Sequence, residues 1–254
     1  MQHRTVGIVA VAGIAAVLIG GVAGAAVMPL APDDPGAGVI AGEPAGHAFS
    51  GSIVLDGETF VTYEGIVTSD GTAYLRARSD DGFVRELYQE DGIVYARLET
   101  TGTDQVEELG RTFGADIVRQ RDEDGRLTTF LRADEPDRRV EASVTDWNEV
   151  VVDNLQLTAY EQVDDGRYEP RNGWFATGRE YRVTGASGEV RVDPGSGAVT
   201  EADVAFRRTF AGSYLAYYFG DSDSVDTEIS YERRPAPAAV DPPEWVETVR
   251  AGAE

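Results

Sequence analysis

Side chains able to do chemistry are few in this 254-residue chain, which has two histidines, His3 and His47, and neither cysteine nor lysine. Both histidines precede Phe49, near which we expect the folded domain to begin. We therefore expect that domain to lack Ser–His dyads, thiolate nucleophiles, His or Cys metal sites and lysine Schiff bases. The sequence predicts a protein that is not an enzyme and that uses no metal and no cofactor.

Carboxylates are the one abundant reactive group, with 45 Asp and Glu in the chain. Two carboxylates at the right separation are enough for glycoside hydrolysis. A carboxylate-dependent hydrolase therefore stays open as the least favoured alternative. A solvated acidic surface is the simpler interpretation of the same residues.

Aromatic residues gathered between positions 206 and 219 form the candidate ligand-binding site. Concave ligand sites are lined mainly by apolar and aromatic groups, although packing in a core explains such a cluster equally well. The candidates are Phe206, Phe210, Tyr214, Tyr217, Tyr218 and Phe219, with Trp147 from an earlier segment.

Tight turns recur along the part of the chain that must position these residues. Asp-Gly readily adopts the positive φ of a two-residue hairpin turn. Between turns, apolar residues alternate with polar ones, as in Val94, Ala96 and Leu98 against Tyr95 and Arg97, which predicts strands with one core face and one wet face. The Asp-Gly pairs are Asp56-Gly57, Asp70-Gly71, Asp81-Gly82, Asp91-Gly92, Asp124-Gly125 and Asp165-Gly166.

Three short helices are predicted among the strands. Capping-box spacings begin at Asp104 and at Asp146, and the second helix should lay Trp147, Val151 and Leu155 on the sheet. A third helix starts after Asp241, with Trp245 docking on the sheet. Later strands are expected at 168–174, 178–184, 189–193, 199–208 and 227–233, with hairpin turns at 185–188 and 194–197.

Charge and composition bear on the medium and the partners. The chain has 22 arginines against 45 acidic residues, a formal net charge of −23. Such a surplus requires dense counterions for a compact state, which indicates a halophile; an acidic protein from a GC-rich genome is the alternative. Without a basic patch to neutralise phosphates, we expect no nucleic acid partner.

The N-terminal segment, residues 5–30, is almost wholly Val, Ile, Ala, Leu and Gly. At about 1.5 Å per residue, a helix of this length crosses a hydrocarbon core about 30 Å thick. Arg4 precedes it while Asp33 and Asp34 follow, which predicts a single-pass cell-membrane protein with its N-terminus inside and its domain extracellular. The alternative is a cleaved signal peptide, suggested by Ala23-Gly24-Ala25, which would make the protein secreted.

Domain organisation follows from these segments. Residues 1–30 form a transmembrane anchor or signal peptide, and residues 31–48, rich in Pro, Gly, Ala and acid, form a flexible tether. Residues 49–254 form a β-rich extracytoplasmic domain of the α+β class. Without cysteine, no lipid anchor through a thioether is available to it.

The order of elements resembles the LolA/LppX lipoprotein-carrier superfamily, including haloarchaeal surface lipoproteins of unknown function. The resemblance covers roughly residues 50–250 and is carried by successive Asp-Gly hairpins, a middle helix, the 188–195 strand and turn, a closing strand at Tyr231 and Pro243-x-Trp245. It implies a curved antiparallel sheet, a half-open barrel, with helices on a concave face that holds acyl chains or other apolar groups.

The leading hypothesis is accordingly a membrane-tethered, non-enzymatic module that binds a lipid or other apolar ligand at the cell surface. The alternative is a structural or sensory ectodomain that binds another envelope protein.

Overall fold

The computed structural model describes residues 46–176, 180–210 and 222–252. The chain divides into two compact units, residues 1–30 and 31–254, and every described residue belongs to the second. The predicted membrane segment and nearly all of the predicted tether therefore lie outside the described residues. Within the described ranges, no helix has the length and apolar character needed to cross a membrane.

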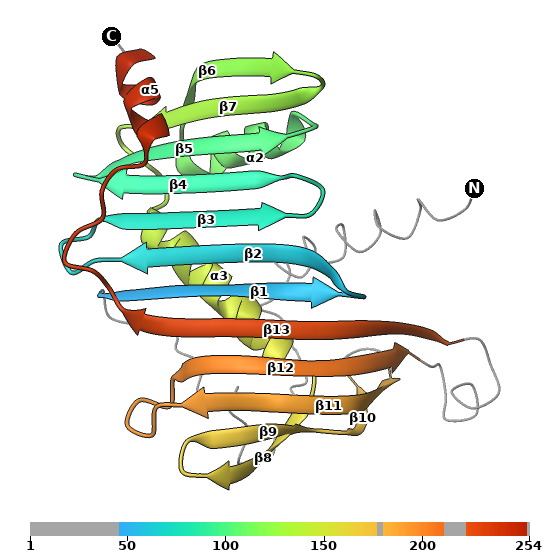
Figure 1. The fold of residues 1–254 in the computed structure, drawn as a ribbon. Coiled ribbons are helices and arrows are strands. Elements are labelled where there is room, and N and C mark those ends of the chain that lie inside the picture. The colour runs from blue at the N-terminus through green and yellow to red at the C-terminus, as the bar shows by residue number, and fades with distance from the viewer. Residues whose placement is uncertain (1–45, 177–179, 211–221, 253–254) are drawn as a thin grey trace. The chain divides into compact units, whose positions relative to one another are not determined.

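One antiparallel sheet of 13 strands runs through the domain (Figure 1). Its order is β6-β7-β5-β4-β3-β2-β1-β13-β12-β11-β9-β8, with β10 beside β11. The two end strands, β6 and β8, do not pair with each other, so the predicted antiparallel sheet is present and it is open. The strands are β1 (His47–Leu55), β2 (Glu58–Val67), β3 (Ala73–Ser79), β4 (Val84–Glu90), β5 (Ile93–Thr100), β6 (Asp116–Glu123), β7 (Arg126–Ala133), β8 (Ala159–Asp164), β9 (Arg167–Arg171), β10 (Gly173–Ala176), β11 (Glu180–Val192), β12 (Val199–Phe210) and β13 (Asp223–Pro235).

The Asp-Gly pairs all lie at hairpin turns, as predicted. In the β1–β2 turn, Asp56 and Gly57 have φ of 52° and 81°, and in the β4–β5 turn Asp91 and Gly92 have φ of 50° and 80°. Two successive residues with positive φ are the requirement of the turn whose twist matches that of the strands. In the β2–β3 and β3–β4 turns only the glycines, Gly71 and Gly82, have positive φ, so the four turns of the meander from β1 to β5 are of two kinds.

The hairpin predicted at residues 185–188 is wrong, because these residues lie inside the continuous strand β11. A bulge falls between Thr184 and Ser187. A Cβ atom on Gly188 would lie 2.0 Å from the carbonyl oxygen of Asp203 on β12. Glycine is thus required here for close approach of two backbones and not for a turn.

The predicted turn at 194–197 is confirmed between β11 and β12. Asp193 Oδ1 accepts hydrogen bonds from the backbone N–H groups of Gly195 and Ser196, at 2.9 and 2.7 Å. The closing Gly197 has φ of 74°. The turn is therefore held by an aspartate side chain, as is common at the start of such turns.

The described helices are α2 (Asp104–Phe113), α3 (Val140–Leu155) and α5 (Glu244–Gly252). The predicted capping box at Asp104 is wrong, because the N-cap is Thr103 and it makes no side-chain capping bond. The predicted start of the second helix at Asp146 is also wrong, since α3 begins at Val140. Gln89 Oε1 on β4 accepts a hydrogen bond from the backbone N–H of Val140 at 2.8 Å, so a distant strand supplies the cap.

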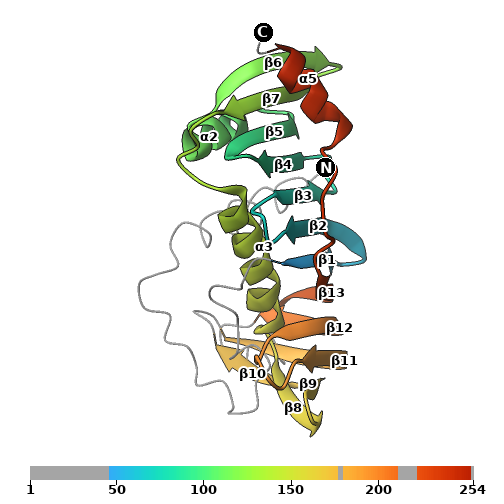
Figure 2. The same cartoon turned by 90° about the vertical axis from the view of Figure 1, so that its left-hand side faces the viewer.

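The helices divide between the two faces of the sheet, as Figure 2 shows. Helices α2 and α3 cover one face, here called the inner face, and α5 packs on the opposite, outer face. The prediction that the helices share one face is therefore wrong for α5. So is the expectation that Tyr95 faces water, because Tyr95 is only 4% exposed, beneath α5.

The main core lies between the inner face and the two helices α2 and α3. Alternate residues of the central strands, among them Phe49, Leu75, Leu87 and Leu98, are buried there. A smaller apolar cluster on the outer face joins strands β4, β5 and β7 to α5; its buried residues are Tyr88, Tyr95, Phe130, Val246 and Val249.

Candidate functional site

The described members of the predicted aromatic site pack in or against the main core. Phe206 on β12 is 3% exposed, and Phe210 and Trp147 are partly buried against the same cluster. Trp147 stacks on Tyr63, with ring centroids 6.0 Å apart, and Phe210 contacts Tyr181 at 5.9 Å. The other four candidates, Tyr214, Tyr217, Tyr218 and Phe219, lie outside the described residues, so a shared ligand site stays a prediction.

The inner face is closed where α3 lies on it. Val144 and Val151 of α3 are 0% exposed, and Leu155 is 1% exposed. Deep in this contact, Tyr231 OH donates a 2.5 Å hydrogen bond to Asn148 Oδ1, and burial raises the pKa of Tyr231 above its ordinary value of 10.0. In this part of the inner face, side chains fill the space between helix and sheet.

His47 does not lie in a tether, because it is the first residue of β1 and is 6% exposed. Within the described ranges, no group of three or more His, Cys, Asp or Glu residues is arranged to hold a metal ion.

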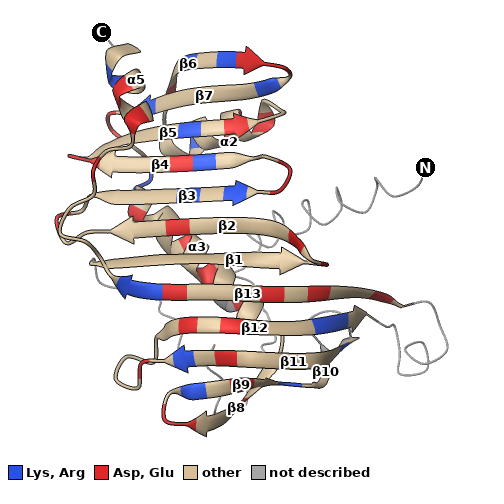
Figure 3. Cartoon of the chain, in the orientation of Figure 1, with Lys and Arg blue, Asp and Glu red and all other residues tan. Residues whose placement is uncertain are grey.

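The outer face carries a transverse row of charged residues instead. Strand pairing aligns them side by side from β5 to β11, and Figure 3 shows acidic and basic stretches next to one another on β3, β4 and β5. The row is Arg97, Glu86, Arg76, Glu64, Ser50, Glu232, Glu201 and Arg191.

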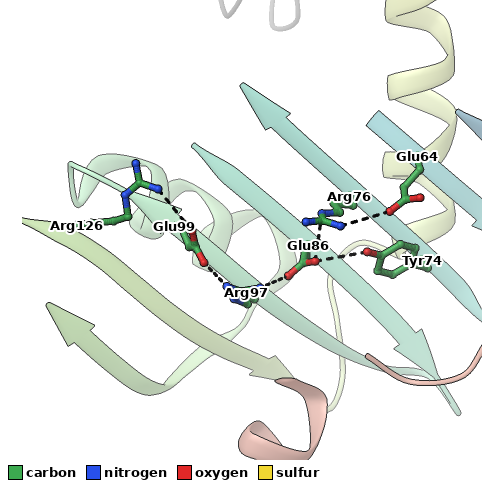
Figure 4. A network of polar contacts seen from close by, with 7 residues as sticks. All are labelled: Glu64, Tyr74, Arg76, Glu86, Arg97, Glu99 and Arg126. Atoms are coloured by element: carbon green, nitrogen blue, oxygen red, sulfur yellow. Dashed lines mark hydrogen bonds and ion pairs between the residues drawn. The ribbon is translucent and has the colours of Figure 1, made fainter. Parts of the chain in front are cut away.

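Glu86 is the centre of the most connected part of this row (Figure 4). Its side chain is 6% exposed; one oxygen lies 2.7 Å from Arg97 Nη1, and the other lies 3.4 Å from Arg76 Nε and 3.5 Å from the Tyr74 hydroxyl. Burial, followed by the charge of Glu86, raises the pKa of Tyr74 above 10.0. With two guanidinium groups and a phenol around it, this carboxylate is held as an ion pair partner, which is a structural role.

The free edge at β6 differs from both faces because its side chains are mostly exposed. Ile117 is 54% exposed, and strand β6 hydrogen-bonds to β7 alone among the described strands. Beside Ile117 lies a shallow groove of about 420 Å³ between α2 and the sheet, lined by Val106, Glu107, Gly110, Arg111, Ala115, Ile117 and Leu131. An aliphatic side chain and an open strand edge thus adjoin one mainly apolar groove.

Two arginines on β6 lack acidic partners. Arg119 pairs in register with Phe130 and Arg121 with Thr128, which places both on the outer side of the edge. Among the residues that the structure describes, neither has a carboxylate within ion-pairing distance. In a chain with 45 acidic residues, two uncompensated guanidinium groups two positions apart are an attractive contact for carboxylates from outside.

No functional role was predicted for β6 from the sequence. The segment DIVRQRDE has few apolar residues and no alternation, so no strand pattern was visible beyond the Asp124-Gly125 turn that follows it. Ile117 and Val118 next to two spaced arginines were the signal available.

Comparison with known proteins gives no family. No family model matches the sequence, and no curated protein matches it. Among solved structures, a chain from "The complex structure of Pseudomonas aeruginosa MucA/MucB" is similar at 14% identity, over 76% of this chain and 94% of that chain, with a TM-score of 0.14. Nothing is inferred from so low a TM-score, and the resemblance to LolA/LppX carriers rests on the sequence features alone.

Proposed function

We propose that this chain is a non-enzymatic, extracytoplasmic binding module that takes up an extended segment of another envelope polypeptide at β6. The observation that carries the proposal is the coincidence, on one open edge strand, of the exposed Ile117 and the unpaired Arg119 and Arg121. The partner segment would add to the sheet as a further strand, through main-chain hydrogen bonds. Its specificity would come from an aliphatic side chain in the groove and from acidic residues facing the two arginines.

Strand addition suits β6 for a second reason. An exposed edge strand is an aggregation hazard, and charged side chains are the usual protection against it. Arg119 and Arg121 provide that protection, because pairing with an uncharged strand would leave both guanidinium groups without a counter-charge. A segment with carboxylates two positions apart would form ion pairs with both arginines, so the charges that disfavour other strands would favour this one.

The lipid-carrier hypothesis needs an open apolar cavity on the inner face. Helix α3 fills its part of that face with Val144, Val151 and Leu155, all buried. The groove beside β6 is wide enough for a side chain or two but is shallow. These observations favour a polypeptide over an acyl chain as the partner, and the half-open barrel with an apolar concave face remains the second hypothesis.

Site-specific photocrosslinking in the native host tests the proposal. A benzophenone amino acid at position 117 should crosslink to one polypeptide of defined mass, and the acidic variant Arg119→Glu/Arg121→Glu should abolish that product. The control position is Val163, 43% exposed on the opposite edge strand β8, which should give no such product.

Two results would overturn the proposal. One is equal crosslinking from positions 117 and 163, which would indicate nonspecific contact. The other is recovery of one lipid per chain in organic extracts of protein purified in high salt, with no product from position 117; this would return the lipid-carrier hypothesis to first place.

A further inference from the structure

Arg85 lies on strand β4, near enough to Glu108 of α2 and Asp146 of α3 for their charges to act on its guanidinium group. It shares the inner side of β4 with Leu87 and Gln89, which are 0% and 4% exposed. Gln89 caps α3 at Val140, two residues after Arg138. Arg138, in the loop that leads into α3, lies near enough to Arg85 for its charge to act on the Arg85 guanidinium group.

Arg85 and Arg138 each have a buried Nε–H group without a hydrogen-bond partner in the described structure. Arg138 uses its Nη2 for an ion pair with Asp146 of α3. Arg85 has no carboxylate within ion-pairing distance among the described residues, and its nearest aromatic contact is the Phe83 ring, 6.0 Å from Cζ. Two guanidinium groups therefore present unsatisfied donors in one region.

The charged forms of Arg85 and Arg138 are unfavourable in this region without a counter-ion. Burial lowers the pKa of Arg85; the acids Glu108 and Asp146 act in the opposite sense, and the charge of Arg138 lowers the pKa further. Glu108 is exposed and Asp146 is already engaged by Arg138. A buried donor without an acceptor is costly, more so on a charged group.

We propose that Arg85 and Arg138 together hold a small monovalent anion of the chloride class at the junction of β4, α2 and α3. Such an ion accepts hydrogen bonds from both Nε–H groups and compensates their charge without the space that a carboxylate or phosphate ligand needs. A water molecule could accept the same bonds but would leave the two charges uncompensated. A chain with a net charge of −23 that requires dense salt meets chloride at high concentration.

The ion would be part of the fold. It would join strand β4 to the loop before α3 through two arginines, so the salt that the acidic surface needs would also supply an internal anion. This inference is independent of the partner proposed for β6.

Bromide replaces chloride at such sites and identifies them by anomalous scattering. Crystals of the full chain grown in sodium bromide should show one anomalous peak within hydrogen-bond distance of both Arg85 Nε and Arg138 Nε. Ordered water there, or no peak, would overturn the proposal.

A measurement in solution distinguishes anion binding by Arg85 from a role of this side chain in packing alone. The equilibrium constant for folding of the parent should rise about tenfold for each tenfold increase of chloride above its Kd, with sodium gluconate keeping the total salt constant. Arg85→Met retains much of the side-chain volume and should remove this dependence. Equal destabilisation of Arg85→Met in both salts would contradict the proposal.

Arg78→Met is the matched control, because Arg78 is an exposed arginine on the neighbouring strand β3. It removes the same charge and should retain the full chloride dependence. If it also lost that dependence, the effect would belong to general screening and the proposed site would be refuted.

Discussion

The two faces of the sheet are built from the same strands but differ in how their side chains are stabilised. On the inner face, Phe49, Leu75 and Leu98 are buried under helices, and apolar contact holds the layers together. On the outer face, over most of the strands, charges pair across neighbouring strands and α5 covers only the end near β6. The inner face is therefore stabilised by burial of apolar surface. On the outer face, the charged groups stay hydrated and form ion pairs with one another.

The charged outer face gives a physical reason why this wide sheet does not associate with a second sheet. A bare apolar face of this width would attract a second sheet or another copy, whereas a face that carries carboxylates and guanidinium groups remains hydrated. One exception lies within the row of charges on the outer face. Glu86 is on the charged face and yet nearly buried.

The largest effect is expected from the inner face. Phe49 is 1% exposed and lies 5.8 Å from Tyr63 and 6.2 Å from Tyr231, measured between ring centroids. Phe49→Ala should lower the free energy of unfolding by about 3–5 kcal/mol, since it removes buried surface and leaves a cavity. Denaturant unfolding at fixed high salt measures it. On the outer face, Arg191→Ala replaces an exposed side chain and should leave the free energy of unfolding almost unchanged, so a comparable loss in both variants would refute the contrast.

The second effect tests the exception. Glu86→Gln should cost about 1–3 kcal/mol, because it leaves Arg76 and Arg97 near a neutral, nearly buried group. Glu64→Gln, at an exposed position of the same row, should cost at most about 1 kcal/mol, with its carboxylate 3.9 Å from Arg76. Equal losses would mean that burial does not set the strength of these pairs.

A third comparison lies within the inner face, between two buried tyrosines. Tyr231→Phe should cost about 1 kcal/mol or more, since it leaves Asn148 Oδ1 without its donor. Tyr63→Phe should be neutral or stabilising, because its hydroxyl is buried without a partner among the described residues. Thermal unfolding of the two variants side by side provides the test. The reverse order would show that Tyr63 has an acceptor and Tyr231 does not need one.

The smallest effects are pH dependences of opposite sign. Hydrogen bonds from Ser196 lower the pKa of Asp193 below 3.8, so the stability that Asp193 contributes is present above that value and lost as pH falls through the lowered pKa. Burial, with repulsion from Asp146 and Asp153, raises the pKa of Glu149 above 4.5. The stability gained by protonated Glu149 is present below 4.5 and lost as pH rises through the raised pKa.

At neutral pH, Asp193→Asn should therefore destabilise and Glu149→Gln should stabilise. Both differences should vanish at acid pH, where the parent carboxyls are protonated. Unfolding measured across pH at the lowest salt that keeps the fold would reveal them, since salt screens exposed groups. A destabilising Glu149→Gln at neutral pH would contradict the assigned repulsion.

Sequence patterns were reliable where a local requirement had one solution. Asp91-Gly92 could be read as a turn because two successive positive φ angles suit few other pairs. Gly188 could not be read correctly, because the reason for it is the Asp203 carbonyl of another strand. The start of α3 was missed for the same reason, since its cap comes from Gln89, 51 positions away in the chain.

The candidate site shows the same limit. Phe206 and Trp147 were recognised as notable aromatic residues, but no local pattern distinguishes a lining residue from a core residue. The unpaired state of Arg119 and Arg121 depends on which acids fold near them, so it is visible only in three dimensions.

The pairing of β1 with β13 in the middle of the sheet has a consequence for the order of folding. Ser52 meets Ser230 across this pair, 178 positions apart along the chain. The meander from β1 to β5 can form through its own local hairpins. The two halves of the sheet can join only after β13, the last strand, has been synthesised. Such distant pairing slows folding, so during synthesis β1 remains an unsaturated edge until β13 emerges. We therefore expect nascent chains that end before residue 223 to be sensitive to protease within β1 and complete chains to be resistant there.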